Sequence, residues 1–135
     1  MKSSISILIV DDELMMRNLL ENILSREGYE IHSAEDGLKA LELLKTRKID
    51  IVITDMKMPS MDGFKLLGII KREHPEIGMI IMTAYGDTYT VKDALLLGAD
   101  EYVTKPFKSY EISLVVERAY WRILSANNQA SREHI

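Results

Sequence analysis

The feature that most limits the fold of this chain is the regular alternation of short apolar runs with longer segments of helical periodicity. Five such runs follow one another at intervals of about 20 to 25 residues. They are residues 5–10, 29–34, 50–54, 79–82 and 101–103. Alternating strands and helices are typical of βαβ units, in which helices cover both faces of a parallel sheet. The sequence therefore predicts an α/β fold with five strands and five helices.

Turn residues and polar residues refine this prediction. Gly28 and Gly98 are well placed to end the first and fourth helices, and Asp36 can cap the start of the second. The run 29–34 is the most polar of the five, because Glu30 and His32 alternate with its apolar positions. We therefore expect that strand at an edge of the sheet.

Length and composition limit the number of domains and the classes of function that this chain can have. At 135 residues, the chain is long enough for one domain and too short for two ordinary ones. The net charge of −4 argues against nucleic-acid binding by this domain, and the absence of cysteine excludes disulfides and thiolate chemistry. With no signal-peptide pattern and no membrane-spanning apolar run, we expect a cytoplasmic protein without membrane contact. The expected domain covers 1–126, and 127–135 is a polar tail or the start of a linker.

The central run ends in an aspartate. Residues 51–53 are apolar and β-branched, as in a strand buried on both faces, and Asp55 follows directly. Pro59 cannot donate to a sheet, so the strand must stop before it. Open α/β sheets bind ligands at the carboxyl ends of their strands, where Asp55 is expected. The alternative interpretation is that Asp55 only caps a turn.

Polar residues also follow other strands. Since parallel strands share one carboxyl edge, Asp11, Asp12, Asp55, Thr83 and Lys105 are expected together. Three adjacent carboxylates would repel one another by about 4 kcal/mol per pair, so a cation is needed, and oxygen ligands suit Mg²⁺. The lysine and the hydroxyl can hold the oxygens of a phosphoryl group. This set predicts a carboxylate that accepts a phosphoryl group, whereas taken singly the acids could cap helices and the threonine could simply end a strand.

Four segments together resemble a known family. They are Leu8-Ile9-Val10-Asp11-Asp12-Glu13, Asp55-Met56-Lys57-Met58-Pro59 with Asp62-Gly63, Thr83-Ala84, and Lys105-Pro106-Phe107. In this order and spacing they are similar to the receiver domain of two-component response regulators, over residues 5 to about 124. The resemblance implies a flavodoxin-like, doubly wound sheet of strand order 2-1-3-4-5.

The resemblance also implies an acceptor and a metal site. Asp55 is then the phosphoacceptor, and the donor is a sensor histidine kinase, a phosphotransfer protein or a small acyl phosphate. Asp12, Asp55 and the backbone carbonyl of Lys57 bind Mg²⁺, for which Mn²⁺ can substitute, and Asp11 acts largely through water. Such a domain is not an enzyme beyond catalysing its own phosphorylation and dephosphorylation.

Further roles follow from the same resemblance. Thr83, the backbone of Ala84 and Lys105 contact the phosphoryl group, and Tyr102 is the aromatic residue whose rotamer follows Thr83. On a short strand, an aromatic residue also commonly serves packing alone. Pro106 follows a peptide bond that is cis in the family. Lys57 and Tyr85 occupy positions that tune the lifetime of the phosphoryl group, and a slow self-dephosphorylation is the hypothesis here.

The C-terminal third is the expected signalling face. In the family, residues 87–124 contact an output domain or a downstream protein, and a homodimer is another expected use of this face. The last helix should run from Ser109 to about residue 126, with Tyr120, Trp121 and Leu124 either extending past the sheet or folding back on its edge. The sequence of the segment 56–63 resembles that of receivers in NtrC-type transcriptional activators, which also carry an ATPase domain.

Two other function classes fit the sequence less well. A free-standing metal-dependent phosphohydrolase would need a second acid near Asp55, but Lys57 stands two residues after it. A flavodoxin-like cofactor binder would need phosphate-cradling loops rich in Gly, Ser and Thr, whereas the loops here are acidic.

Overall fold

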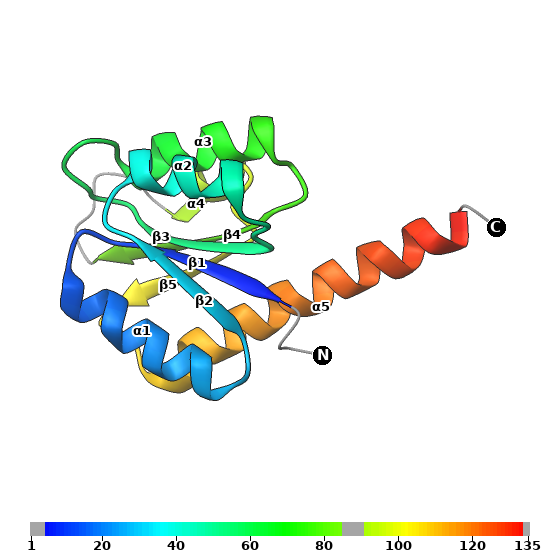
Figure 1. Cartoon of the computed structure of the whole chain (residues 1–135), viewed down its shortest axis with the longest axis horizontal. Helices are drawn as coiled ribbons and strands as arrows, with labels where there is room; N and C mark the ends of the chain where they lie inside the picture. The colour runs from blue at the N-terminus through cyan, green and yellow to red at the C-terminus, as the bar shows by residue number, and fades with distance from the viewer. Residues whose placement is uncertain (1–4, 85–90, 134–135) are drawn as a thin grey trace.

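The computed structural model describes residues 5–84 and 91–133, with Val91 and the residues from 127 onward described by their backbone alone. Its strands are β1 (Ser6–Val10), β2 (Glu30–Ala34), β3 (Ile51–Asp55), β4 (Gly78–Ala84) and β5 (Glu101–Lys105). Its helices are α1 (Leu14–Arg26), α2 (Gly37–Thr46), α3 (Gly63–Glu73), α4 (Val91–Leu96) and α5 (Ser109–Glu133). The strands are parallel, in the order β2-β1-β3-β4-β5, which confirms the predicted fold (Figure 1).

The core consists of two apolar layers, one on each face of the sheet. Helices α2, α3 and α4 cover one face, and α1 and α5 cover the other (Figure 1). Alternate residues of each central strand enter the two layers, as Leu8 and Ile9 of β1 do. Every residue of β1 and β3 is buried for this reason. By contrast, β2 buries only Ala34 fully, which confirms its predicted place at the edge.

Local signals end and begin the helices as predicted. Gly28 and Gly98 have φ angles of 99° and 104°, a left-handed conformation that side chains disfavour, and they follow α1 and α4. The Asp36 carboxylate accepts a hydrogen bond of 2.8 Å from the backbone amide of Lys39 and so caps α2. Asp62 caps α3 in the same way, with a 2.7 Å bond from the Lys65 amide.

Helix α5 is longer than expected. It continues to Glu133 instead of ending near residue 126, and it projects beyond the sheet at the edge opposite the strand carboxyl ends (Figure 1). Its 25 residues span about 37 Å at 1.5 Å per residue. Tyr120 is buried against Tyr29, with ring centroids 6.4 Å apart, whereas Trp121 is 58% exposed. Within the described ranges, no helix is both long and apolar enough to cross a bilayer.

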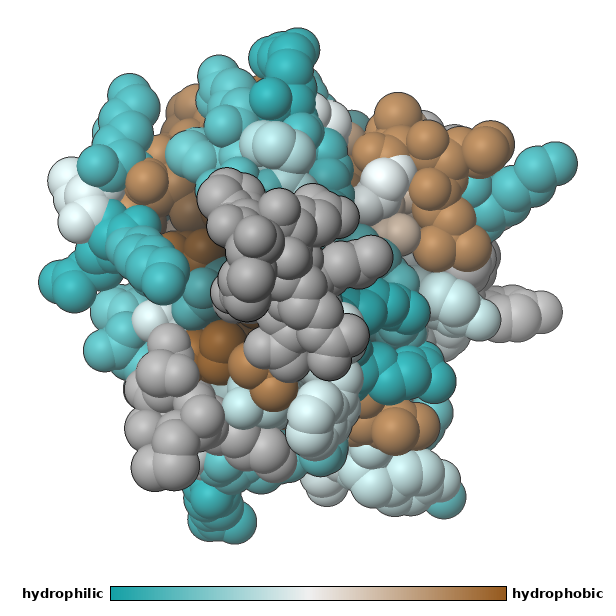
Figure 2. All heavy atoms as spheres, turned by 90° about the vertical axis from the view of Figure 1, so that its right-hand side faces the viewer, coloured by the Kyte–Doolittle hydropathy of each residue, from teal (hydrophilic) through white to brown (hydrophobic). Residues whose placement is uncertain are grey.

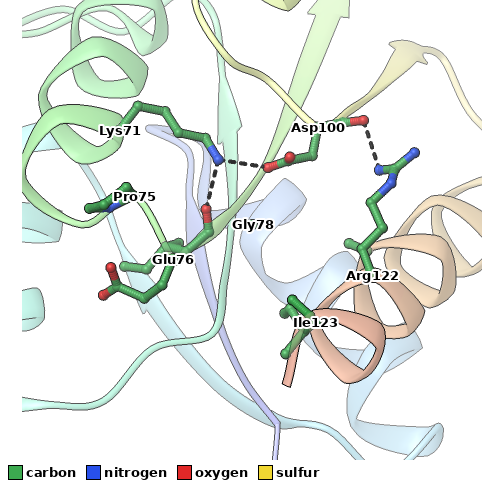
Figure 3. A pocket seen from close by; sticks show the side chains of 10 residues that line it. Lys71, Pro75, Glu76, Gly78, Asp100, Arg122 and Ile123 are labelled. Atoms are coloured by element: carbon green, nitrogen blue, oxygen red, sulfur yellow. Dashed lines mark hydrogen bonds and ion pairs between the residues drawn. The ribbon is translucent and has the colours of Figure 1, made fainter. Parts of the chain in front are cut away.

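A buried carboxylate fastens α5 to the start of β5. The side chain of Glu101 is only 7% exposed and accepts hydrogen bonds from Arg118 Nε at 3.1 Å and Nη2 at 2.7 Å. Arg122 Nη2 lies 2.5 Å from the other carboxylate oxygen of Glu101. Arg122 also donates to the backbone carbonyl of Asp100 at 2.9 Å (Figure 3). Two arginines one helical turn apart therefore hold α5 against the sheet.

Candidate functional site

The register of the sheet brings four strand ends to one edge. The paired residues there are Val10 with Thr54, Asp55 with Met82, and Ala84 with Lys105. Asp11 therefore emerges beside the end of β3, and Thr83 lies one residue beyond the partner of Asp55. Thus residues from β1 to β5 that are far apart in sequence converge because the strands are parallel and in this order.

Three aspartates form the centre of this edge. Asp11, Asp12 and Asp55 each offer a carboxylate oxygen, and these oxygens all lie within 4.8 Å of one another. Asp11 is fully buried and Asp55 is 8% exposed, whereas Asp12 is exposed. Asp11 uses one oxygen to accept a 2.9 Å hydrogen bond from the Glu13 amide, which fixes its orientation. The predicted convergence of the three acids is present.

Lys105 bridges two of these acids. Its Nζ lies 3.1 Å from Asp55 Oδ2 and 3.2 Å from Asp11 Oδ2. Burial alone would lower the pKa of Lys105, but the Asp55 and Asp11 carboxylates together raise it above its ordinary value. Burial raises the pKa of Asp55; the Lys105 ammonium opposes this effect and the Asp11 carboxylate adds to it. The lysine is therefore charged, and the Asp55 carboxyl is held in a partly desolvated setting.

The remaining predicted residues lie at or just after the ends of β3, β4 and β5. Thr83 is buried near the end of β4, and Ala84 is exposed at the end of that strand. The side chain of Lys57 is exposed, while its backbone amide donates a hydrogen bond to the Asp55 carboxylate. The Lys105–Pro106 peptide bond is cis.

The predicted switch residue Tyr102 lies on the edge strand β5. It is 42% exposed and sits opposite Ile81 in the sheet. Tyr85 lies outside the described residues, as do positions 87–90 of the expected signalling face. On the described part of that face, exposed apolar residues come from α4, the turn that follows it, β5 and α5. They are Leu95, Leu96, Leu97, Tyr102, Tyr110, Leu114 and Trp121.

Sequence reasoning missed Arg17. From the first turn of α1, its Nη1 donates a 2.7 Å hydrogen bond to the backbone carbonyl of Asp11. This contact ties the start of the helix to the end of β1 and so helps to orient the acidic segment. A signal was available, since Arg17 lies about one and a half helical turns after the two acids.

The chemistry of the donor set suits a hard divalent cation. Three carboxylates that share a small volume supply oxygen ligands and excess negative charge, which are what Mg²⁺ selects. Lys105 neutralises only part of that charge. The residues present therefore fit a magnesium ion.

A separate hollow lies at the opposite edge of the sheet. It has a volume of about 240 Å³ and lies between the start of β4 and the second half of α5 (Figure 3). Its charged groups are already paired, because Lys71 Nζ donates to Asp100 at 2.9 Å and to the Ile77 carbonyl at 3.0 Å. Viewed from this side, the surface is mainly hydrophilic with scattered apolar clusters (Figure 2). The acidic edge is therefore the better candidate for chemistry.

Comparison with known proteins agrees with this geometry. Residues 7–117 match the family model described as the response regulator receiver domain. The chain belongs to this family. The domain is therefore a signalling receiver of two-component response regulators. Neither a free-standing phosphohydrolase nor a flavodoxin-like cofactor binder is favoured.

Two relatives and one solved structure illustrate this similarity. The chain is 42% identical over 113 residues to the regulatory protein AtoC of Escherichia coli (strain K12), covering 84% of this chain and 24% of AtoC. It is 40% identical over 112 residues to the sporulation initiation phosphotransferase F of Bacillus subtilis (strain 168), covering 83% and 90% of the two chains. The crystal structure of NtrX from Brucella abortus superposes with a TM-score of 0.88 and 34% identity, covering 93% of this chain and 29% of NtrX.

Proposed function

We propose that Asp55 is the residue of this receiver that accepts the phosphoryl group. The observation that carries the proposal is the position of its carboxylate, with oxygens of Asp11 and Asp12 within 4.8 Å and Lys105 Nζ at 3.1 Å. Among the three acids, Asp55 combines a place at the end of the central strand β3 with direct contact to the lysine. Asp11 is fully buried, and among the described acids Lys105 pairs with Asp11 and Asp55, which favours Asp55 as the nucleophile.

Asp12, Asp55 and the carbonyl of Lys57 would hold Mg²⁺ or Mn²⁺, and Asp11 would act through water. Bound there, the ion would keep the carboxylate ionised and offset the charge on the phosphoryl oxygens. The close carboxylates support this assignment, since they need a cation to lie together. The Glu13 amide holds Asp11 in place, and the Lys57 amide holds Asp55, so both acids are oriented in advance.

The transfer is a displacement at phosphorus. A carboxylate oxygen of Asp55 forms the new P–O bond while the bond between phosphorus and the donor's imidazole nitrogen breaks. The electron pair of that bond remains with the imidazole, and the product is an aspartyl phosphate. The donor would be a sensor histidine kinase or a phosphotransfer protein. In the product, Lys105, the Thr83 hydroxyl and the Ala84 amide would hold the phosphoryl oxygens.

The signal would leave through the α4, β5 and α5 face. Movement of Thr83 toward the phosphoryl group would free space for Tyr102, whose exposed ring could then turn inward. Phosphorylation can shift this equilibrium only through contacts that differ between the two states. The exposed apolar residues of this face support a role in binding an output domain, a downstream protein or a second copy of the chain.

The output is transcriptional control in a cytoplasmic phosphorelay, as the names of relatives such as the transcriptional regulatory protein SrrA suggest. The domain would turn over no substrate beyond its own phosphorylation and dephosphorylation. Because this chain matches 24% of AtoC and 53% of SrrA, the activities of those longer proteins are not transferred with the domain.

Labelling with acetyl phosphate tests the acceptor. The wild-type protein and Asp55→Asn are incubated with acetyl phosphate and Mg²⁺, and the mass of the intact protein is followed. We expect one phosphoryl group on the wild type, none on Asp55→Asn, and none on the wild type when EDTA replaces Mg²⁺. Equal labelling of Asp55→Asn would move the acceptor to another residue.

A further inference from the structure

The start of helix α3 lies directly against the backbone of the candidate acceptor. Gly63, the first residue of α3, is buried, and its amide donates a 2.8 Å hydrogen bond to the carbonyl of Met56. The amide of Met56 in turn donates to the carbonyl of Met82 at 3.1 Å. The peptide that follows Asp55 is therefore held on one side by β4 and on the other by α3.

Gly63 has no room for a side chain. A Cβ atom placed on it would overlap the carbonyl oxygen of Asp55, and would lie 2.9 Å from the Asp55 carbonyl carbon and 3.0 Å from Met56 Cα. All of these are backbone atoms, so no side-chain rotation can relieve the overlap. Among the described glycines, only Gly28 and Gly98 have positive φ angles. Space, and not backbone conformation, is therefore what requires glycine at position 63.

Two other glycines show that this demand is specific. A Cβ atom on Gly37 would meet the side chain of Met61, with Sδ at 2.8 Å, and a flexible methionine can move away. A Cβ atom on Gly68, in the middle of the same helix α3, would meet nothing within 4 Å. Gly68 is thus a matched control for Gly63.

We propose that Gly63 is a positioning residue for the phosphoryl transfer, because its contact with the Asp55 backbone sets where the acceptor carboxylate lies. This inference rests on the proposed role of Asp55. A side chain at position 63 must push the end of β3 away from α3. That movement shifts the Asp55 carboxylate relative to Asp11, Asp12 and Lys105, which come from other strands and do not follow it. Displacements of about 1 Å in a reacting group can slow a reaction by about 100-fold.

The cap of α3 belongs to the same arrangement. The Asp62 carboxylate accepts the 2.7 Å hydrogen bond from the Lys65 amide and so fixes the first turn of the helix. This bond is the contact that the structure shows for the Asp62 carboxylate, and the residue is half-exposed. Loss of this cap should therefore change the position of Asp55 only through the contact between Gly63 and the backbone of Asp55 and Met56.

The test compares Gly63→Ala with Gly68→Ala in the chain as it stands. Labelling by acetyl phosphate is followed by intact mass over a range of Mg²⁺ concentrations, and urea unfolding reports that each variant is folded. For folded Gly63→Ala we expect labelling slowed between about 10- and 100-fold and half-saturation at a higher Mg²⁺ concentration. Gly68→Ala should label as the wild type does. A purely structural role would lower stability without moving the Mg²⁺ dependence of the folded protein.

Labelling of folded Gly63→Ala at the wild-type rate and with the wild-type Mg²⁺ dependence would overturn the inference. If Gly63→Ala does not fold, Asp62→Ala decides, since it keeps the glycine and removes only the cap. Slower labelling of folded Asp62→Ala then supports the inference, and unchanged labelling overturns it. Asp55→Asn is run in parallel: labelling of that variant would refute the acceptor assignment itself, which is a different outcome from normal labelling of Gly63→Ala.

Discussion

Lys105 Nζ lies 3.1 Å from Oδ2 of Asp55, although the two residues are 50 positions apart in sequence. The same nitrogen lies 3.2 Å from Oδ2 of Asp11, so one ammonium group neutralises acids from β1 and β3. These are the acids that would surround a divalent ion. The lysine and the ion therefore compete for the same negative charge.

This competition predicts the effect of Lys105→Met on metal binding. Removing the ammonium leaves more negative charge for the ion, so Mg²⁺ should bind about 10-fold more tightly, which is ~1.4 kcal/mol. Titration calorimetry without a phosphodonor measures this affinity. Lys108→Met, which removes an exposed lysine of the following loop, is the control and should bind Mg²⁺ as the wild type does. Unchanged or weaker binding by Lys105→Met would show that the lysine does not oppose the ion.

The raised pKa of Asp55 predicts how stability depends on pH in the absence of metal. Because burial raises this pKa in the folded protein, the folded state binds the Asp55 proton more tightly than the unfolded state does. The stability that Asp55 contributes is therefore complete below the unfolded pKa of about 4 and is lost as the pH rises through the folded pKa. Asp55→Asn has no such loss, so its stability relative to the wild type should increase with pH over this window.

Urea unfolding in EDTA between about pH 3 and pH 8 measures that difference. Carboxylates far from this site cancel in the comparison because both proteins carry them. Adding Mg²⁺ should reverse the order at neutral pH, since an ion at 10 times its dissociation constant stabilises the wild type by about 1.4 kcal/mol. A difference between the two proteins that stays constant with pH would mean that burial does not raise the Asp55 pKa.

The acidic edge was predictable from sequence because it depends only on strand direction. Once the strands are parallel, Asp11, Asp55 and Lys105 must emerge on one side, whatever the details of packing. The caps at Asp36 and Gly28 were predictable for a similar reason, since each acts within a few residues of its own helix. Local chemistry and sheet direction thus carry most of the fold and the centre of the site.

Contacts that depend on how a helix crosses the sheet were not predictable. Glu101 is an ordinary polar residue in the sequence, yet it is buried beneath two arginines of α5. Periodicity places Arg118 on one face of a helix but does not say which strand that face meets. The same limit applies to Tyr120, whose burial against Tyr29 depends on where α5 passes the α1–β2 connection.

Because the Glu101 carboxylate is buried, removing it and removing its two arginine partners should lower stability by different amounts. Glu101→Gln removes the buried charge and leaves two half-exposed arginines that water can solvate, so we expect a loss of about 1 kcal/mol in unfolding free energy. Arg118→Ala with Arg122→Ala leaves the carboxylate buried and unpaired, for which the expected loss is about 3 kcal/mol.

Urea unfolding measures both changes, and hydrogen exchange of the α5 amides shows whether the helix detaches locally. Arg72→Ala, at an exposed position of α3, is the control for losing an arginine and should be close to neutral. A larger loss from Glu101→Gln than from the double arginine variant would contradict the view that desolvation of the carboxylate dominates.

The exposed side chain of Lys57 is expected to lengthen the lifetime of the aspartyl phosphate. Lys57 follows Asp55 by two residues, its amide donates a hydrogen bond to the Asp55 carboxylate, and its long side chain is exposed. There it can hinder the water that hydrolyses the acyl phosphate. Lys57→Asn shortens the side chain and should speed hydrolysis about 10-fold, equivalent to ~1.4 kcal/mol of barrier. Loss of phosphate after removal of the donor measures the rate, and Lys65→Asn on the exposed side of α3 is the control. Equal half-lives for Lys57→Asn and the wild type would assign the control of lifetime to other residues.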